Sequence, residues 1–230
     1  MLCYKWKKHF EGVFNKKEWL KKRITEGHVF RKLNVQGKVF VEYAPLEKAW
    51  VPIEGSGFLC IYCLWVSGKF KAQSYGKQLL EYVINDAKKK GKQGVCVISS
   101  KKKKSHLADK KFFLKYGFEV VDQIEDYELL SLSFNHQKPF FCKSVKQMMI
   151  DSNHITIYYS PQCPFTLNCI HEIKEYIKDC NIQVDFIKID TLEKAKNIPC
   201  IFNNWAVFKN GKYVSHILLN KKGFEKLLND

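Results

Sequence analysis

The feature that most constrains the fold is an apolar, strand-like run that passes through a turn of small residues into a helix. Residues 58–66 form the longest apolar run, and residues 76–90 place apolar side chains at the spacing of an amphipathic helix. Main-chain N–H groups at the start of a helix lie at the positive end of the helix dipole and can donate hydrogen bonds to a phosphate there. The same spacing is typical of a plain strand-to-helix turn, so the turn alone leaves both interpretations open.

Periodicity in the first 135 residues predicts an α+β domain whose mixed sheet is flanked by helices. The most apolar strand, 58–66, is expected at the centre of the sheet, and Gln36-Gly37 is expected to turn a hairpin. The expected helices are 16–26, 76–90 and 106–116, and the expected strands are 29–35, 38–43, 58–66, 95–98, 118–121 and 129–134.

Two motifs in this order resemble the GCN5-related N-acetyltransferases (GNATs). The phosphate-binding motif of that family begins with Gln or Arg, which is followed by any two residues, a Gly, any one residue, and a final Gly or Ala. The turn from Lys71 to Gly76 occupies the corresponding six positions in this chain. The run from Lys111 to Phe118 resembles the family's aromatic-rich helix that ends in Gly-Phe. The resemblance covers about residues 13–135. It implies acetyl-CoA as cosubstrate and a splay between two strands, ending near Val66 and Ser100, that admits the pantetheine arm.

The resemblance also implies which residues hold the cosubstrate. Backbone N–H groups of residues 72–77 would bind its diphosphate, with Lys69, Lys71 and Lys77 adding positive charge nearby. The expected cofactor-binding residues are Trp65, Val66, Lys71, Ala72, Gln73, Ser74, Tyr75, Gly76, Lys77, Ser100 and Phe113.

Three departures from the family pattern bear on activity. Ser74 replaces a glycine, and a serine forced to positive φ would be strained. Phe113 stands where the family often has a tyrosine acid, and phenylalanine cannot give a proton; Tyr116 is then the candidate catalytic acid, with an ordinary packing role as the alternative. Little precedes residue 16, so the family's first strand and first helix are expected to be shortened or missing.

Beyond a linker at 138–152, the pattern resembles a small α/β thioredoxin-like domain. The expected order is strand 155–159, helix to about 178, strand 184–189, short helix 192–196, a hairpin at Asn210-Gly211 and a last helix 222–228. A cis peptide bond is expected at Ile198-Pro199. The residues of 153–230 further resemble a YoaP-type C-terminal domain, found in a group of microbial acetyltransferases.

Cys163 is the best nucleophile candidate of the nine cysteines, and it is the second candidate catalytic residue. The sequence Cys163-Pro164-Phe165-Thr166 resembles a one-cysteine glutaredoxin site, and a thiol at a helix N-terminus has its thiolate favoured by the dipole. Thr166 takes the place of a resolving cysteine, so two-thiol exchange within this site is excluded. The alternative is an inherited fold used for docking or substrate binding.

The amino-acid composition limits the kinds of partner and the cellular location that we expect for the protein. The net charge is +16, but Arg23 and Arg31 are the only arginines, so the composition disfavours nucleic acid as a partner. No apolar run could span a bilayer, and the N-terminus lacks a signal-peptide core. Cys60, Cys63 and Cys96 lie within apolar segments, and the other cysteines show no CxxC or Cys/His spacing, which favours reduced thiols, no metal site and a cytoplasmic location.

The sequence therefore predicts two domains, 1–137 and 153–230, and an acetyl-CoA-dependent N-acetyltransferase. The acetyl group would pass by direct attack of an unidentified primary amine, carried by a small molecule or a peptide. Two alternatives stay open: a non-catalytic CoA- or thiol-binding protein, and a monothiol redox protein that uses Cys163. The oligomeric state is left open, with a homodimer among the options.

Overall fold

The computed structural model describes residues 9–104 and 107–229, which fall into two compact units. The six-stranded unit contains residues 24–49 and 53–142, and the four-stranded unit contains residues 9–23, 50–52 and 143–229. In the described part of the chain, no helix has the length and apolar character needed to cross a membrane. The expectation of a shortened first strand concerns a region whose residues 1–8 lie outside the described residues.

The sheet of the six-stranded unit has the order β1-β2-β4-β5-β7-β6. Its strands are β1 (Val29–Lys32), β2 (Val39–Pro45), β4 (Phe58–Val66), β5 (Gly94–Ser100), β6 (Glu119–Ile124) and β7 (Tyr127–Ser133). Only β4 and β5 run parallel, because a crossover helix joins them, whereas the other neighbours are antiparallel. The predicted mixed sheet, with 58–66 inside it, is confirmed. A small extra pair, β3 (Ile53–Glu54) with β8 (Phe140–Phe141), was not predicted.

Strands β4 and β5 separate after a short stretch of pairing. They are paired from Phe58↔Gly94 to Ile61↔Val97 and no further, although β4 continues to Val66 and β5 to Ser100. On its other edge β4 stays paired with β2, but the register shifts between Glu42↔Cys63 and Tyr43↔Ile61, so that Tyr62 is the extra residue of a β-bulge. A bulge bends and twists the strand that carries it. The expected splay between the two strands is therefore present.

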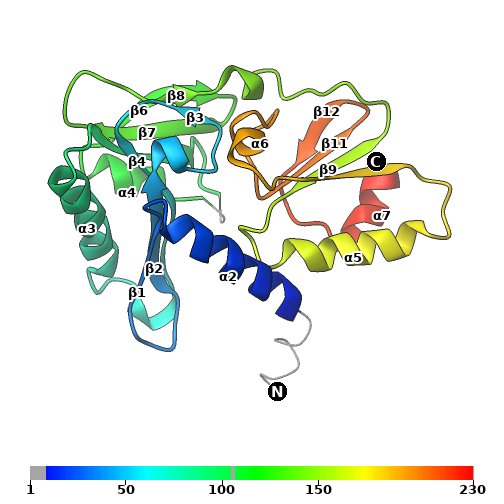
Figure 1. Ribbon diagram of the computed structural model, residues 1–230, viewed down its shortest axis with the longest axis horizontal. Helices are drawn as coiled ribbons and strands as arrows, with labels where there is room; N and C mark the ends of the chain where they lie inside the picture. The colour runs from blue at the N-terminus through cyan, green and yellow to red at the C-terminus, as the bar shows by residue number, and fades with distance from the viewer. Residues whose placement is uncertain (1–8, 105–106, 230) are drawn as a thin grey trace. The chain divides into compact units, whose positions relative to one another are not determined.

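One face of this sheet is covered by the crossover helix α3 (Tyr75–Lys89) and by the short helix α4 (Lys110–Leu114) (Figure 1). The apolar side chains of α3 that were predicted from their spacing are buried there against β2, β4 and β5. Phe113 and Phe118 join the same core. Helix α4 is much shorter than the predicted helix 106–116, because the backbone is extended at Asp109, whose carboxylate caps the helix at the Lys111 N–H.

The four-stranded unit has the sheet order β10-β9-β11-β12, with β9 and β10 parallel and the other pairs antiparallel. Its elements are β9 (Ile155–Tyr159), α5 (Thr166–Ile177), β10 (Val184–Lys188), α6 (Leu192–Lys196), β11 (Trp205–Lys209), β12 (Lys212–Ser215) and α7 (Lys221–Asn229). The predicted element order is confirmed. The hairpin turns where Asn210 and Gly211 both have positive φ, as a two-residue turn of type I′ requires. The cis bond expected at Pro199 is wrong, since the described peptide bonds are all trans.

Both faces of the four-stranded sheet are buried. Trp205 and Val207 of β11 face α5 and α7, while the alternate residues Ala206 and Phe208 face the opposite side. That opposite side is covered by Trp19 of helix α2 (Phe10–Ile24), together with Trp50 and α6. Helix α2 lies within the sequence-predicted domain 1–137, yet it packs in the four-stranded unit. The predicted helix 16–26 thus begins six residues earlier than expected.

Candidate functional site

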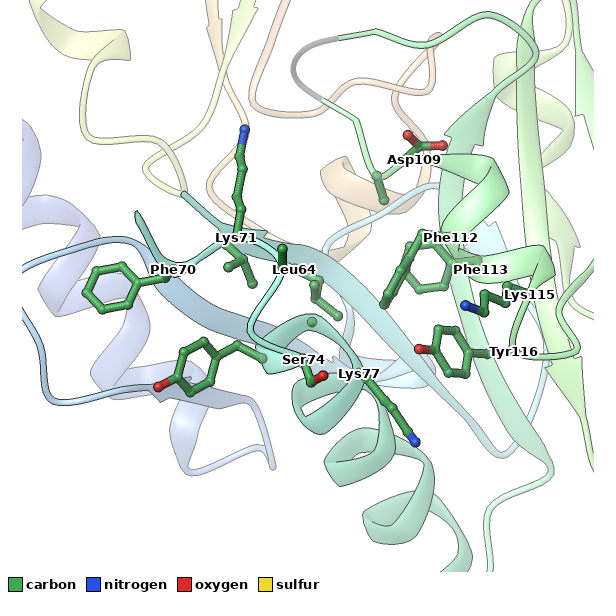
Figure 2. A pocket seen from close by; sticks show the side chains of 15 residues that line it. Leu64, Phe70, Lys71, Ser74, Lys77, Asp109, Phe112, Phe113, Lys115 and Tyr116 are labelled. Atoms are coloured by element: carbon green, nitrogen blue, oxygen red, sulfur yellow. The ribbon is translucent and has the colours of Figure 1, made fainter. Parts of the chain in front are cut away.

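A pocket of about 660 Å³ opens in the six-stranded unit where α3 begins (Figure 2). One wall is the end of β4 and the turn that follows it, and the facing wall is the segment around α4. The residues lining it are Leu64, Val66, Phe70, Lys71, Ala72, Ser74, Tyr75, Gly76, Lys77, Ala108, Asp109, Phe112, Phe113, Lys115 and Tyr116. The pocket thus contains eight of the residues predicted to bind the cosubstrate, together with the predicted acid.

The turn into α3 presents a row of main-chain donors to this pocket. The first helical hydrogen bond is donated by Gln78 N–H to the Ser74 carbonyl, so the N–H groups of residues 75–77 have no acceptor in the helix. Those of residues 72–74 likewise have none among the described residues. Six successive donors therefore lie at the positive end of the α3 dipole, which is the setting in which proteins bind phosphate groups.

The turn achieves this shape with two strained residues. Ala72 and Ser74 both have φ of +61°, in the left-handed region that glycine adopts without strain. Ser74 precedes α3 directly, and its side chain makes no cap to the helix. Ser74 thus adopts the positive φ at which we expected a serine to be strained, and Ala72 carries the same strain, which was not predicted.

Replacing Ala72 by Gly is expected to stabilise the protein by about 0.5 kcal/mol. The left-handed conformation costs a non-glycine residue roughly 1–2 kcal/mol, and glycine recovers this against an unfolded-state entropy cost of roughly 0.5–1 kcal/mol. The matched control is Ala87→Gly at a buried position in the last turn of α3, which should destabilise by about 1 kcal/mol. Urea unfolding of both variants measures the two effects. If Ala72→Gly and Ala87→Gly lowered the free energy of unfolding equally, Ala72 would not be strained in the native protein.

Lysines surround the pocket. Lys71 and Lys77 lie on the turn and on α3, and Lys115 lies on the facing wall (Figure 2). Lys77 also makes a loose ion pair with Glu81, at 3.7 Å. Lys115 was missed by sequence reasoning; it directly precedes Tyr116, and that adjacency to a candidate site residue was the available signal. Lys69, expected nearby, does not line the pocket.

Tyr116, rather than Phe113, presents its side chain to the pocket. Figure 2 shows the Tyr116 hydroxyl pointing from the α4 wall toward Ser74 and Lys77 across the opening. Phe113 touches the pocket but is only 1% exposed, packed against Phe112 and Phe118 in the core. The position at which the resemblance led us to look for a tyrosine is thus filled by a core aromatic, and a hydroxyl reaches the pocket from the residue three positions later.

Three predicted cofactor-binding residues do not line the pocket. The Gln73 side chain donates to the Lys69 carbonyl at 2.6 Å and so braces the turn. Ser100 is buried at the end of β5, where its hydroxyl donates to the Lys102 carbonyl. Trp65 is partly exposed on β4, and Lys38 Nζ lies 5.9 Å from its ring centroid. Trp65 and Ser100 lie on the stretches of β4 and β5 beyond their last mutual pair.

Comparison with known proteins decides the family. The model of the acetyltransferase (GNAT) family matches residues 2–118. The Bacillus subtilis (strain 168) protein named uncharacterized N-acetyltransferase YoaP is 40% identical over 226 residues, which are 97% of this chain and 90% of that protein. The chain belongs to the GNAT acetyltransferase family. This confirms the predicted family, fold class and enzyme class, an N-acetyltransferase that takes its acetyl group from acetyl-CoA.

Two solved GNAT structures illustrate the likeness. A GNAT-family acetyltransferase from Elizabethkingia anophelis with acetyl-CoA bound is 21% identical, covers 51% of this chain and 83% of its own, and has a TM-score of 0.38. A GNAT-family acetyltransferase from Brucella melitensis in complex with acetyl-CoA is 16% identical, covers 44% of this chain and 54% of its own, and has a TM-score of 0.32.

The four-stranded unit of this GNAT protein contains the second predicted site. A YoaP-like family model matches residues 183–226, which lie in this unit. Cys163 precedes α5 (Thr166–Ile177), and the N–H groups of Phe165 and Thr166 point at its sulfur. Helix α2 lies over the same loop: Gly12 approaches the Pro164 carbonyl so closely that a Cβ at residue 12 would overlap it. His9 packs edge-on against Phe165, with ring centroids 5.0 Å apart.

Burial affects the pKa of the Cys163 thiol more than the start of helix α5 does. Burial raises the pKa of Cys163, and the N–H groups of residues 165 and 166 and the Lys16 charge offset this only in part. The cavity between the thiol, Gly12 and Asn15 has a volume of only about 10 Å³, roughly the space of one water molecule. Cys200 is fully buried, which raises its pKa to about 12, so it is no second nucleophile. The favoured thiolate expected from the sequence is thus opposed by the packing of α2.

Replacing Gly12 by Ala is expected to speed alkylation of Cys163 by iodoacetamide about tenfold. The new methyl group overlaps the Pro164 carbonyl, so α2 must move away from the thiol, while alanine itself favours the helix. Peptide mapping by mass spectrometry measures the rate at Cys163 separately from the other cysteines. The control is Gly223→Ala in α7, where the added methyl meets only the flexible Leu219 and Asn220 side chains. An unchanged rate in the Gly12 variant would show that α2 does not shield the thiol.

Proposed function

We propose that this protein transfers the acetyl group of acetyl-CoA to the primary amine of a small molecule or a peptide by direct attack of the amine on the thioester. The single observation that carries the proposal is the row of six main-chain N–H groups, residues 72–77, which have no acceptor among residues 9–104 and 107–229 and lie at the edge of a pocket of about 660 Å³. They fit the diphosphate of acetyl-CoA, a doubly charged group that needs many donors.

Different parts of the pocket and of the strands beside it bind different parts of acetyl-CoA. The N–H groups of 72–77 bind the diphosphate, and Lys71, Lys77 and Lys115 add positive charge around it. The edges of β4 and β5 beyond Ile61 and Val97 have lost each other as partners, so they offer N–H and C=O groups to the amides of the pantetheine arm. The thioester is thereby directed through the splay.

The chemistry follows from this placement. The acceptor nitrogen forms its bond to the acetyl carbon, the carbonyl oxygen takes up negative charge, and the C–S bond then breaks. Tyr116 donates its phenolic proton to the departing thiolate and regains a proton from the acetylated nitrogen. Holding both reactants in one geometry supplies much of the rate.

A thermal-shift titration tests the proposal. Acetyl-CoA at 100 times its Kd should stabilise the folded protein by about 2.7 kcal/mol, and CoA should do the same to a similar extent. Release of CoA in the presence of a panel of primary amines then separates an enzyme from a protein that only binds CoA. If neither acetyl-CoA nor CoA raises the Tm at millimolar concentration, the proposed function fails.

For the four-stranded unit we propose a thioredoxin-like module that serves docking or substrate binding. Its sheet order and its βαβ-hairpin-helix connectivity support the assignment. The raised pKa and the tight cover of Cys163 argue against rapid thiol exchange. None of the eight cysteines in the described part of the chain forms a disulfide, which agrees with a reducing, cytoplasmic location.

A further inference from the structure

A buried histidine and glutamate form a pair in the six-stranded unit that the mechanism above does not use. His28 Nε2 lies 3.0 Å from Glu42 Oε1, and the two residues are 3% and 7% exposed. Burying a carboxylate and an imidazole is costly unless they contact each other, so a core position filled by such a pair calls for an explanation. Apolar residues of similar volume would fill the same space without that cost.

The pair lies on the face of the sheet opposite to the pocket. Val41 and Tyr43, the neighbours of Glu42 on β2, are buried in the core beneath α3. Because side chains alternate along a strand, Glu42 points to the other face. The pocket is formed by the start of α3 and by α4, on the α3 side. A thioester that enters from the pocket and passes between β4 and β5 therefore emerges on the face that carries Glu42.

Tyr62 places the pair at the opening itself. It directly follows Ile61, the last β4 residue paired with β5, and it is the extra residue of the β4 bulge. Glu42 is paired with the next residue, Cys63. The ring of Tyr62 lies against the imidazole of His28, with centroids 5.1 Å apart and planes inclined by 33°. One aromatic ring thus separates His28 from the point where the strands part.

The chemistry of the pair suits proton removal. A carboxylate only accepts hydrogen bonds, so His28 Nε2 is the donor to Glu42, and Nδ1 is the nitrogen at which the ring can take up a proton. A base whose second nitrogen is oriented by a carboxylate is the arrangement that activates nucleophiles in many transferases and hydrolases.

We propose that His28 is the proton acceptor for the amine of the acetyl acceptor and that Glu42 is the positioning residue that holds its ring. The inference rests on the proposed function. An acceptor that arrives as an ammonium ion loses one proton to His28, through the Tyr62 hydroxyl or a bridging water, and the buried His28 returns that proton to solvent by the same relay after the acetylated product has left. The amine then attacks, and its second proton ends on the CoA sulfur by way of Tyr116. The amide, the CoA thiol and one solvent proton are the products.

Two small nucleophiles of similar size test this step. Methylamine is almost wholly protonated at neutral pH and needs a base, whereas methoxyamine is almost wholly the free base and does not. We expect Glu42→Gln to slow enzyme-dependent acetylation of methylamine by at least about 100-fold, the range of general base catalysis, and to change that of methoxyamine less than about threefold. The double variant His28→Phe/Glu42→Gln should lose no more, because the two residues act as a unit.

The controls distinguish a loss of proton transfer from a loss of folding or of acetyl-CoA binding. Each variant must retain the Tm shift with acetyl-CoA; loss of the shift in the wild type would defeat the proposed function, not this inference alone. Asp185→Asn disrupts an exposed His154–Asp185 pair of similar type, 2.7 Å apart, and should leave both rates unchanged. If Glu42→Gln slows both nucleophiles equally or neither, or if the acetyl-CoA-binding wild type does not acetylate methylamine, the inference is overturned.

Discussion

A Ser74→Asp variant is expected to bind acetyl-CoA at least about 30-fold more weakly while its free form becomes more stable. Two unit charges 4 Å apart repel by roughly 4 kcal/mol at an effective dielectric constant of 20. Ser74 is exposed, so screening by solvent reduces this to about 2 kcal/mol, which corresponds to about 30-fold in Kd. The diphosphate carries more than one charge, so the estimate is a lower bound.

The stability of the free protein should move in the opposite direction. An acidic side chain at the start of a helix is stabilised by the dipole, by about 0.5 kcal/mol at an exposed site. Aspartate also tolerates the left-handed conformation that Ser74 adopts. The same substitution thus improves the helix and damages the site, a combination that a merely structural turn would not produce.

Isothermal titration with acetyl-CoA and a thermal melt of the free protein measure the two effects. Ser74→Asn is the matched control, since asparagine has the same shape and the same tolerance of positive φ but no charge. It should keep affinity within about threefold. A charged variant that binds as well as the asparagine variant would mean that the diphosphate does not lie at residues 72–77.

The residues that could be predicted from the sequence are those whose placement is local. Strand β4, helix α3 and the turn between them follow from apolar spacing, and this spacing was enough to locate the row of free N–H groups. His28 and Glu42 could not be paired in this way, because they lie 14 residues apart and meet only through the antiparallel register of β1 and β2. No local motif marks such a contact.

Helix α2 shows the same limit at larger scale. Its apolar residues predict a helix, and Trp19 predicts a buried side, but the partner of that side is Trp50 and the core of the four-stranded unit. Chain order suggested that a helix preceding β1 would belong with β1. Helix α2 shields Cys163, and this burial raises the pKa of the thiol. The four residues Cys163-Pro164-Phe165-Thr166 carry no information about that helix, so the raised pKa could not be predicted from them.

Tyr116 illustrates why the catalytic acid was hard to assign from the sequence. A helix through residue 116 would have set the direction of its side chain by the usual spacing. The helix instead ends at Leu114, Tyr116 N–H donates to the Phe113 carbonyl, and Gly117 turns with a φ of +83°. This tight turn changes the direction of the side chain and brings the hydroxyl to the pocket. Helical spacing, counted back from Gly117-Phe118, pointed to Phe113.

Removing that hydroxyl in Tyr116→Phe is expected to lower the rate of acetyl transfer by about 100-fold, the lower part of the range for general acid catalysis. Phenylalanine keeps the ring contact with Phe112, whose centroid lies 5.1 Å away, so folding and acetyl-CoA affinity should change little. The rate of CoA release under saturating acetyl-CoA is the measurement. Tyr176→Phe in α5 makes the same chemical change in the other unit and should leave the rate unaltered.

The identity of the nucleophile distinguishes this effect from loss of the base. The thiolate leaves in the same way whatever nitrogen attacked, so Tyr116→Phe should slow methylamine and methoxyamine to the same degree. Removing the base should slow methylamine alone. If Tyr116→Phe retains full activity with both nucleophiles, the ring is an ordinary packing aromatic and the proton reaches the sulfur from another group. Selective loss with methylamine would instead place Tyr116 on the path that removes the acceptor's proton.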